Sequence, residues 1–437
     1  MCSRHGCGGG YGYLVASASA RILRNRDFLL FWGGQTVSQT GTQITLLALP
    51  LTAIVLLRAS AFEVGLLSAA NTIAYLLVAL PAGVLVDRLG RRRLMLWCDL
   101  GLLLAVGSVP VAQAAGVLTL GQLYAVALIS GVLGVVFLVG YSSYLPVLVE
   151  AEQLMDGNGK LSVSESVAQL AGPGLGALLV GLVGAARAVT ADAVSYGVSA
   201  VCLLLIRGRE QPGARVRPRD QGTAAFAAEL GEGLRYVLRE PILRKAVAWS
   251  GTANFFVIMV ETLGPVFLVR IVGVRPAYVG LLLALAAVGG VAGGLSSGVL
   301  ARRIGSARVG WLPMAVCTFP GLLIPLAAPG WRVLLFAAGW VCWSFGASLC
   351  NVAVTSYQQR TCPPEILGRV SAASRWVKWG PLPLGGVVGG AMASALGVHA
   401  TLWIAVSGAC SSVLWLIFSP LRGLRDLPDR SLAPAAA

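Results

Sequence analysis

The sequence has little charge for its length of 437 residues. Lys, Arg, Asp and Glu make up only 12% of it, about half the share typical of soluble proteins, whereas 57% of the residues are hydrophobic. This composition excludes an ordinary soluble protein, which keeps a charged surface around one or two cores. It also argues against nucleic-acid binding, because no soluble basic domain is present to use the net charge of +15.

Histidine is almost absent, and cysteine is scattered. The two histidines, His5 and His399, fall in the N-terminal tail and in a turn between apolar segments, so no histidine-dependent catalytic triad can form within those segments. The nine cysteines occur singly, and their odd number argues against a disulfide framework. Cys2, His5 and Cys7 lie in a glycine-rich tail, for which we predict disorder rather than a metal site.

A nucleotide-binding loop is also missing. Gly159-Lys160 has Leu154 where the first glycine of a P-loop belongs, and Leu161 where serine or threonine follows the lysine. The sequence therefore predicts that the protein is not an enzyme and uses no cofactor and no metal.

What the chain does have is a series of long apolar stretches. Each is about 20 residues long, the length of a helix that crosses a hydrocarbon core of about 30 Å. They predict an all-α membrane protein with twelve transmembrane helices, at 28–57, 62–86, 94–114, 119–145, 161–183, 187–206, 241–268, 276–301, 310–328, 333–359, 366–394 and 398–419.

The basic residues predict the orientation of these helices. With both termini in the cytoplasm, 26 of the 33 Lys and Arg residues fall on the cytoplasmic side, and two lie within a helix. Five fall outside, namely Arg58, Arg187, Arg270, Arg275 and Arg332. This asymmetry follows the positive-inside rule. We therefore predict a multi-pass protein of the cell (plasma) membrane with both termini cytoplasmic, and its net charge reflects orientation and contact with anionic lipid.

The two halves of the chain repeat each other with a constant offset of 215 residues. Val64-Gly65-Leu66-Leu67 returns as Val279-Gly280-Leu281-Leu282, and the run from Gly83 to Gly90 returns from Gly298 to Gly305. A constant offset across apolar sequence indicates a duplicated membrane domain, as in many transporters. We therefore predict two pseudo-symmetric six-helix bundles.

These bundles and their connections divide the chain into five parts. They are a cytoplasmic N-terminal tail at 1–27, an N-terminal bundle at 28–206, a cytoplasmic linker at 207–240, a C-terminal bundle at 241–419 and a cytoplasmic C-terminal tail at 420–437. From Thr223 the linker has the pattern of an amphipathic helix. That helix either lies on the cytoplasmic leaflet or packs under the C-terminal bundle.

The loop between the second and third predicted helices reads Gly83-x-Leu85-x-Asp87-Arg88-x-Gly90-Arg91-Arg92-Arg93. Gly83 allows helices to approach closely, and Gly90 allows a tight turn. Asp87 can pair with an arginine or cap a neighbouring helix. Together with the twelve helices and the half-chain repeat, this loop resembles the hallmark of the major facilitator superfamily of transporters.

The resemblance implies an inner gate that latches the two halves on the cytoplasmic side while the transporter faces outward. The residues that match are Gly83, Asp87, Arg88, Gly90 and Arg91. The alternative is that the arginines only fix the orientation of the chain. In the second copy, Arg302 replaces the aspartate and Ser306 replaces the following arginine, so we expect a weaker latch there.

The fifth predicted helix contains Gly172-Pro173-Gly174-Leu175-Gly176-Ala177, which is similar to the G-P-x-x-G-G element of the antiporter branch of that superfamily. Gly172, Pro173 and Gly176 carry the similarity, and Gly380-Pro381 and Gly385-Gly386 are their counterparts in the eleventh helix. Proline kinks a helix, and glycines four apart let another backbone approach. We predict a pliable, sealed interface between the halves, with ordinary small-residue packing as the alternative.

A matching seam, part of the same interface between the halves, is expected in the eighth helix, at Gly289, Gly290, Gly293 and Gly294.

Further segments resemble the drug/proton antiporter efflux group of the superfamily, which includes macrolide, tetracycline and siderophore exporters. They are Gly34-Gln35, Ala48-Leu49-Pro50, Ala191-Asp192-Ala193-Val194-Ser195-Tyr196, Glu232-Gly233-Leu234-Arg235-Tyr236-Val237 and Gly368-Arg369-Val370. Two features of many relatives are missing: the fourth helix contains no arginine, and Gly41-Thr42 stands where the first helix often has an acid. The sequence therefore does not match the group's usual proton-coupling residues at these two positions.

Carboxylates within the bilayer are costly, so each is a candidate for function. A carboxylic acid held away from water can take up a proton from one side and release it to the other. The proton-coupling candidates are Glu261, Asp192 and Glu165, and Asp99 is a further acid within a helix. Glu261 is the first choice because its neighbours bring no compensating charge. The alternative is a structural, hydrogen-bonded carboxyl, and Arg187 is close enough in sequence to pair with Asp192.

The predicted substrate cavity combines neutral hydrogen-bonding groups, aromatic rings and one arginine, which suits a mid-sized amphiphilic compound. Its candidate residues are Gln35, Gln39, Gln43, Asn254, Phe255, Trp343, Asn351, Tyr357, Arg375 and Trp376. Arg375 and Lys378 share a helix face. The sequence leaves three roles open for these two side chains: contact with an anionic substrate, an ion pair with Glu165 across the halves, or extension to the cytoplasm.

We therefore expect a secondary active efflux transporter that exports an antibiotic or another amphiphilic natural product by alternating access and proton antiport. With no nucleotide site, its energy must come from an ion gradient or from the gradient of the substrate. Alternatives on the same fold are a siderophore exporter and a lysophospholipid flippase or importer. A membrane receptor or scaffold without transport is a third possibility. We expect a monomer whose partners are the substrate, protons and the lipid bilayer, without nucleic acid.

Overall fold

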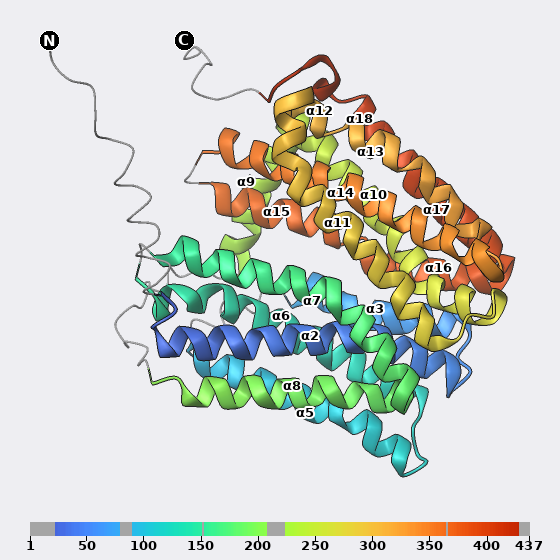
Figure 1. Ribbon diagram of the computed structural model, residues 1–437. Coiled ribbons are helices and arrows are strands. Elements are labelled where there is room, and N and C mark those ends of the chain that lie inside the picture. The colour runs from blue at the N-terminus through green and yellow to red at the C-terminus, as the bar shows by residue number, and fades with distance from the viewer. Residues whose placement is uncertain (1–21, 79–89, 151–152, 208–222, 364–365, 428–437) are drawn as a thin grey trace, which may run out of the picture.

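The computed structural model describes residues 22–78, 90–150, 153–207, 223–363 and 366–427, and the regular elements of these residues are all helices. They form two bundles packed against each other, one coloured blue to green and the other lime to red in Figure 1. The N-terminal bundle contains α2 (Arg26–Val55), α3 (Ala61–Leu77), α5 (Arg91–Ala114), α6 (Leu120–Leu148), α7 (Leu154–Val183) and α8 (Ala185–Leu205).

The C-terminal bundle repeats this arrangement with more breaks. α10 (Pro241–Val266) continues into the π-helical turn η2 (Phe267–Ile271), and α11 (Pro276–Ile304) follows. The ninth predicted helix is divided into α12 (Ser306–Val309), α13 (Leu312–Cys317) and the 3₁₀-helix η3 (Phe319–Leu326). The rest of the bundle is η4 (Gly330–Val333), α14 (Leu334–Thr361), α15 (Leu367–Trp379), α16 (Leu382–Leu396), α17 (Val398–Ser412), α18 (Leu414–Ile417) and η5 (Pro420–Gly423).

Nine helical segments of the described residues are long and apolar enough to cross a membrane. The three other predicted spans fall outside this set for identifiable reasons. The polar stripe of α2 lowers its mean hydropathy, α3 is described only as far as residue 78, and the eleventh helix is broken in two. The fifth helix also differs, because α7 begins at Leu154 rather than at 161.

The eleventh helix, predicted as one piece at 366–394, ends as α15 and starts again as α16 after Gly380-Pro381. Pro381 has no N–H group to donate to the preceding helical turn, so the hydrogen-bond ladder stops there. The carbonyl of Lys378 instead accepts a hydrogen bond of 2.8 Å from Nδ2 of Asn254 on α10. A neighbouring helix thereby satisfies a carbonyl at the break, as the apolar surroundings require.

Two glycines of the half-chain repeat form matching turns. Gly90 precedes α5 with a φ of 80°, and Gly305 precedes α12 with a φ of 99°. L-residues with a side chain rarely adopt these angles, so glycine is required at both turns. The turn expected at Gly90 is therefore present, and the repeat preserves it in the second half.

The linker helix α9 (Thr223–Arg239) lies beside α15 of the C-terminal bundle (Figure 1). Gly233 packs on the backbone of Arg369, whose side chain forms an ion pair of 2.5 Å with Glu232. The hydroxyl of Tyr236 donates to the carbonyl of Thr361 at 3.1 Å. Of the two interpretations of this helix, packing under the C-terminal bundle is the one that the structure confirms.

Candidate functional site

The two bundles meet mainly along two helix pairs, and the first pair is α7 with α11. Gly280 of α11 packs directly against Pro173 and Ala177 of α7. A methyl group built on Gly280 would lie 2.5 Å from the carbonyl oxygen of Pro173, so only glycine allows this approach. Further along the pair, Gly181 faces Ala277 in the same manner.

The second pair, α3 with α16, has the same construction. Gly65 of α3 lies against the carbonyl of Gly386, and Gly390 lies against Phe62. A methyl group on Gly390 would be 2.9 Å from Cα of Phe62. Gly65 and Gly280 are equivalent positions of the repeat, so the same duplicated glycine forms the contact in both pairs.

The antiporter-type motif has two faces. Gly172 and Gly176 pack on α2 in their own bundle, against Gln43 and Ile44. Pro173, one position further on, faces α11 of the other bundle. The motif therefore attaches α7 closely to its own half and also forms the contact between halves.

The eleventh helix divides its glycines in the same way. Gly385 and Gly389 pack on α10 of their own bundle, whereas Gly386 and Gly390 face α3 of the other. The two halves thus pack closely at both proline-containing helices, while a pliable, sealed interface there stays a prediction.

The seam predicted on the eighth helix lies elsewhere. Gly289 and Gly293 of α11 pack against Val341 and Phe345 of α14, in the same bundle. The expectation that this seam joins the two halves was wrong. The face of α11 that meets α7 lies nearer the start of the helix, around Gly280.

A charged side chain also links the bundles. Arg270 of η2 donates through Nη2 to the carbonyl of Ala59 at 2.5 Å and to that of Ile54 at 3.3 Å. Both carbonyls belong to the N-terminal bundle, where α2 turns into α3. We call this end of the molecule the Arg270 end. Gly65 and Gly280 lie close to it, each in the second turn of its helix.

The opposite end, called the Gly90 end, carries the predicted inner gate. Gly83, Asp87 and Arg88 lie outside the described residues, while Gly90 and Arg91 form the start of α5. The next residue, Arg92, donates to the carbonyls of Leu203 at 2.7 Å and Leu204 at 2.9 Å. These carbonyls end α8, where a cation also complements the helix dipole. This arginine therefore ties α5 to α8 within one bundle.

At the second copy of the loop, the C-terminal segment supplies a carboxylate. The backbone N–H and the hydroxyl of Ser306 donate to Oδ1 of Asp426 at 2.9 and 3.2 Å. This backbone hydrogen bond holds the pKa of Asp426 below its ordinary value of 3.8. The loop has Arg302 where the first copy has aspartate, and the acid near its turn comes from the chain's own C-terminal segment instead.

The three proton-coupling candidates have different surroundings. Glu261 on α10 and Glu165 on α7 are exposed, and Glu165 accepts a hydrogen bond of 3.5 Å from Gln169. Asp192 on α8 is fully buried, and Oδ1 accepts a hydrogen bond of 3.2 Å from Ser195. Arg187 is exposed, and within the part of the chain that the structure describes Asp192 has no ion pair with it.

The ten predicted cavity residues differ in how exposed their side chains are. The exposed ones are Asn351, Arg375 and Trp376, the half-buried ones are Gln39, Gln43, Asn254 and Phe255, and the buried ones are Gln35, Trp343 and Tyr357. Two of the buried residues are bonded within their own bundle. Gln35 donates to Ser199 at 3.1 Å, and the hydroxyl of Tyr357 donates to Glu240 at 2.7 Å.

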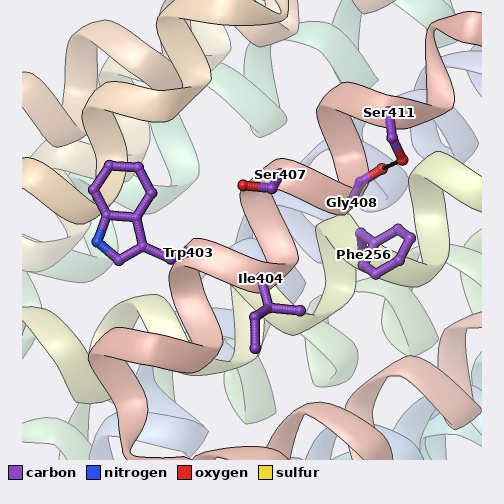
Figure 2. Close-up of a pocket in the computed structure, with 6 residues that line it drawn as sticks. All are labelled: Phe256, Trp403, Ile404, Ser407, Gly408 and Ser411. Atoms are coloured by element: carbon purple, nitrogen blue, oxygen red, sulfur yellow. Dashed lines mark hydrogen bonds between the residues drawn. The ribbon is translucent and has the colours of Figure 1, made fainter.

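Two surface hollows are formed by other residues. Figure 2 shows the first, of about 470 Å³, where Phe256 of α10 lies beside α17. Trp403, Ile404, Ser407, Gly408 and Ser411 of α17 complete its lining. The second, of about 420 Å³, lies at the Arg270 end between the start of α11 and η4. Neither is lined by a predicted cavity residue.

Two sets of residues were missed from the sequence. Arg270 was assigned only to an outer loop, and nothing in its sequence neighbourhood indicates a contact with residues 54 and 59. Asp99 was noted as a charge within a helix, but its association with Tyr196 and Ser199 was not predicted. A possible signal was the polar spacing of α8, where residues 192, 195, 196 and 199 share one face.

The comparisons with known proteins agree with this architecture. The family model of the Major Facilitator Superfamily matches residues 31–379. Over 372 residues the chain is 27% identical to the multidrug efflux pump Tap of Mycolicibacterium fortuitum, which covers 83% of this chain and 88% of that protein. Over 417 residues it is 25% identical to macrolide efflux protein A of Streptococcus pyogenes, which covers 92% of this chain and 97% of that protein.

Solved transporters have the same fold. A bacterial homologue of the iron transporter ferroportin in an inward-facing state superposes with a TM-score of 0.73 at 14% identity, over 91% of this chain and 98% of that one. A bacterial homologue of ferroportin in an outward-facing state gives a TM-score of 0.56 at 16% identity, over 90% of this chain and 98% of that one. With its two repeated bundles and a family match over most of its length, this chain belongs to the Major Facilitator Superfamily of twelve-helix membrane transporters.

Proposed function

We propose that this protein is a secondary active efflux transporter that exports a mid-sized amphiphilic compound, such as an antibiotic, by alternating access and proton antiport. The observation that carries the proposal is the pair of cross-bundle contacts at Gly65 and Gly280, which closes one end of the molecule with backbone-to-backbone packing. The similarity to two efflux proteins supports export as the direction of transport.

The proposal includes an orientation in the cell membrane. The Gly90 end carries the basic residues Arg91, Arg92, Arg93, Arg302 and Arg303, and the positive-inside rule assigns such an end to the cytoplasm. Both termini then lie in the cytoplasm, and the Arg270 end faces outward. In this orientation the contacts at Gly65, Gly280 and Arg270 lie on the outer side, and they support an outward-closed state of the transporter. The better superposition on an inward-facing relative supports that assignment.

Glu261 is the proposed site that binds a proton and the substrate in turn. On α10, Phe256, Met259 and Gly264 occupy the faces toward α17, α16 and α14. Glu261 lies on the remaining face and is exposed, and α10 also contacts α2 and α3 of the other bundle. Among the described residues it has no hydrogen-bond partner. A carboxylate in this position is free to bind either a proton or a cationic group of the substrate.

Export is tested with labelled erythromycin, a macrolide, in inverted membrane vesicles that contain the full chain. We expect an acidic vesicle lumen to drive uptake, and an uncoupler to abolish it. Uptake that does not depend on the pH gradient would contradict proton antiport. Failure to move any macrolide, together with higher drug accumulation in expressing cells, would contradict export.

The role of Glu261 is tested in the same vesicles with Glu261→Gln. We expect the variant to lose the response to the pH gradient, because glutamine cannot release a proton. Glu150→Gln, at an exposed residue outside the helices, is the matched control and should transport as the wild type does. An unchanged pH response of Glu261→Gln would remove Glu261 from the mechanism.

A further inference from the structure

The core of the N-terminal bundle contains a chain of polar side chains that the proposed transport cycle has not used. On α8, Asp192, Ser195, Tyr196 and Ser199 are all buried, with exposed fractions between 0% and 6%. α8 packs against α2 and α5, so these side chains lie inside one half and not between the halves. Polar groups in such a position are costly unless they are bonded or functional.

Asp192 is held against the backbone of α2. Its Oδ1 accepts a hydrogen bond from Ser195, while Oδ2 is buried without a partner among the described residues. Gly41 of α2 makes room for it, since a methyl group built there would lie 2.7 Å from Oδ1. The hydroxyl of Thr45 lies beside the same carboxyl. The side chain is therefore placed in a cradle that a larger residue at position 41 would fill.

Asp99 of α5 is the second buried carboxyl, with an exposed fraction of 0%. In the described part of the chain neither of its oxygens has a hydrogen bond of normal geometry. Ser199 lies next to it and accepts a hydrogen bond of 3.1 Å from Gln35. Asp99 thus has polar neighbours but no cation.

Tyr196 lies within electrostatic range of both carboxyls. Its hydroxyl is 3.0 Å from the hydroxyl of Thr42, which is half-buried on α2. The other titratable groups near the pair are the thiols of Cys98 on α5 and Cys202 on α8. The α2 side chains near the pair, Gln35, Thr42 and Thr45, are neutral, and within the described residues neither carboxyl has an ion pair.

An ionised carboxylate in a dry, low-dielectric core is costly, and among the described residues no cation compensates either Asp99 or Asp192. We infer that Asp99 and Asp192 form a proton-binding pair inside the N-terminal bundle, joined by Tyr196, and that this pair loads and releases protons during the transport cycle. The ligand of the site is the proton itself. Each release converts one carboxylic acid to a carboxylate and passes one proton to water through the Tyr196 and Thr42 hydroxyls, with no change of redox state. The coupling role rests on the proposed antiport, whereas proton binding does not.

Proton binding is measured by infrared difference spectroscopy on the full chain in lipid bilayers, titrated across neutral pH in potassium buffer without a substrate. We expect Asp99→Asn and Asp192→Asn each to remove roughly half of the carboxylic-acid signal of the pair. Glu150→Gln should leave that signal unchanged. If both asparagine variants keep the full signal, the pair is ionised and the inference is wrong. A signal that responds to sodium and not to pH would also overturn it, because the site would then bind a metal cation.

Tyr196→Phe provides a second test that keeps both carboxyls and the shape of the core. We expect it to shift the pH at which the carboxylic-acid signal disappears, because it removes the hydroxyl that lies within electrostatic range of both carboxyls. An unchanged titration would remove Tyr196 from the site. This variant also keeps the inference testable if either asparagine variant fails to fold.

The coupling role has its own readout. In proteoliposomes, we expect Asp192→Asn to lower gradient-driven erythromycin uptake about tenfold or more while exchange without a gradient stays within about twofold of wild type. Equal loss of both activities would overturn coupling through this pair. If the wild type itself moves no erythromycin, the proposed function fails, and the infrared result still decides whether the pair binds protons.

Discussion

Arg270 of η2 and Ala59 of the α2–α3 turn are joined by a hydrogen bond of 2.5 Å, although they belong to different bundles. The turn is shaped for this contact: the Ala59 N–H donates to the carbonyl of Ala53 at 2.9 Å, and Arg58 has a φ of 53°. The same guanidinium nitrogen reaches Ile54 in the last turn of α2. Carbonyls there lack helical partners, and a cation complements the negative end of the helix dipole. One bundle therefore caps a helix of the other.

Arg270→Ala should open the Arg270 end. A hydrogen bond to a charged group contributes about 1.5–3 kcal/mol, so its loss should raise the population that is open at this end about tenfold or more. The measurement is the distance distribution between spin labels introduced as unnatural amino acids at the exposed Arg187 and Arg332, one on each bundle. Arg275→Ala, at an exposed residue nearby, is the control. Equal distributions for both variants would show that Arg270 does not hold this end closed.

Gly280→Ala should hinder closure of the same end. The added methyl group meets the Pro173 carbonyl, and overpacking of this kind costs about 1–3 kcal/mol. We expect a lower rate of macrolide transport with little change in the amount of inserted protein. Gly290→Ala is the matched control, because a methyl group at that position meets nothing within 4 Å. Equal transport by the two variants would contradict a role for the Gly280 contact.

Asn254→Ala should destabilise the C-terminal bundle by about 1–3 kcal/mol, since it leaves the Lys378 carbonyl at the helix break without its partner. Thermal unfolding of the purified protein measures this loss. Asn351→Ala removes the same kind of side chain at an exposed position and should have a much smaller effect. If Asn254→Ala unfolds at the wild-type temperature, the hydrogen bond does not stabilise the break.

The contact between Asp426 and Ser306 should make stability depend on pH. Because the backbone N–H of Ser306 lowers the pKa of this carboxyl from 3.8 in the folded protein, the contact stabilises the fold above that value. The contribution should disappear as the pH falls through the lowered value. The difference in unfolding temperature between wild type and Asp426→Asn, followed from neutral to acidic pH, measures it. A difference that persists at the most acidic pH would contradict this origin.

The sequence by itself determined the class of the protein, its spans and its two halves. Lipid leaves a spanning chain almost no choice but the helix, because every backbone group must be satisfied internally. Apolar runs of helical length therefore locate the spans directly. The repeated glycines were also informative, since Gly65 and Gly280 became the two cross-bundle contacts. The break at Pro381 is the main departure in the fold, although the proline itself is evident in the sequence.

The tertiary structure decided which way the side chains face. Glu261 and Asp192 are both acids within apolar helices, yet one is exposed and the other fully buried. Small residues at positions such as Gly41 determine how closely helices approach, and those approaches depend on helices distant in sequence. Arg270 illustrates the same limit, because its partners lie more than 200 residues away. Hydropathy determines the depth of a residue in the membrane, but only packing against neighbouring helices determines what it touches.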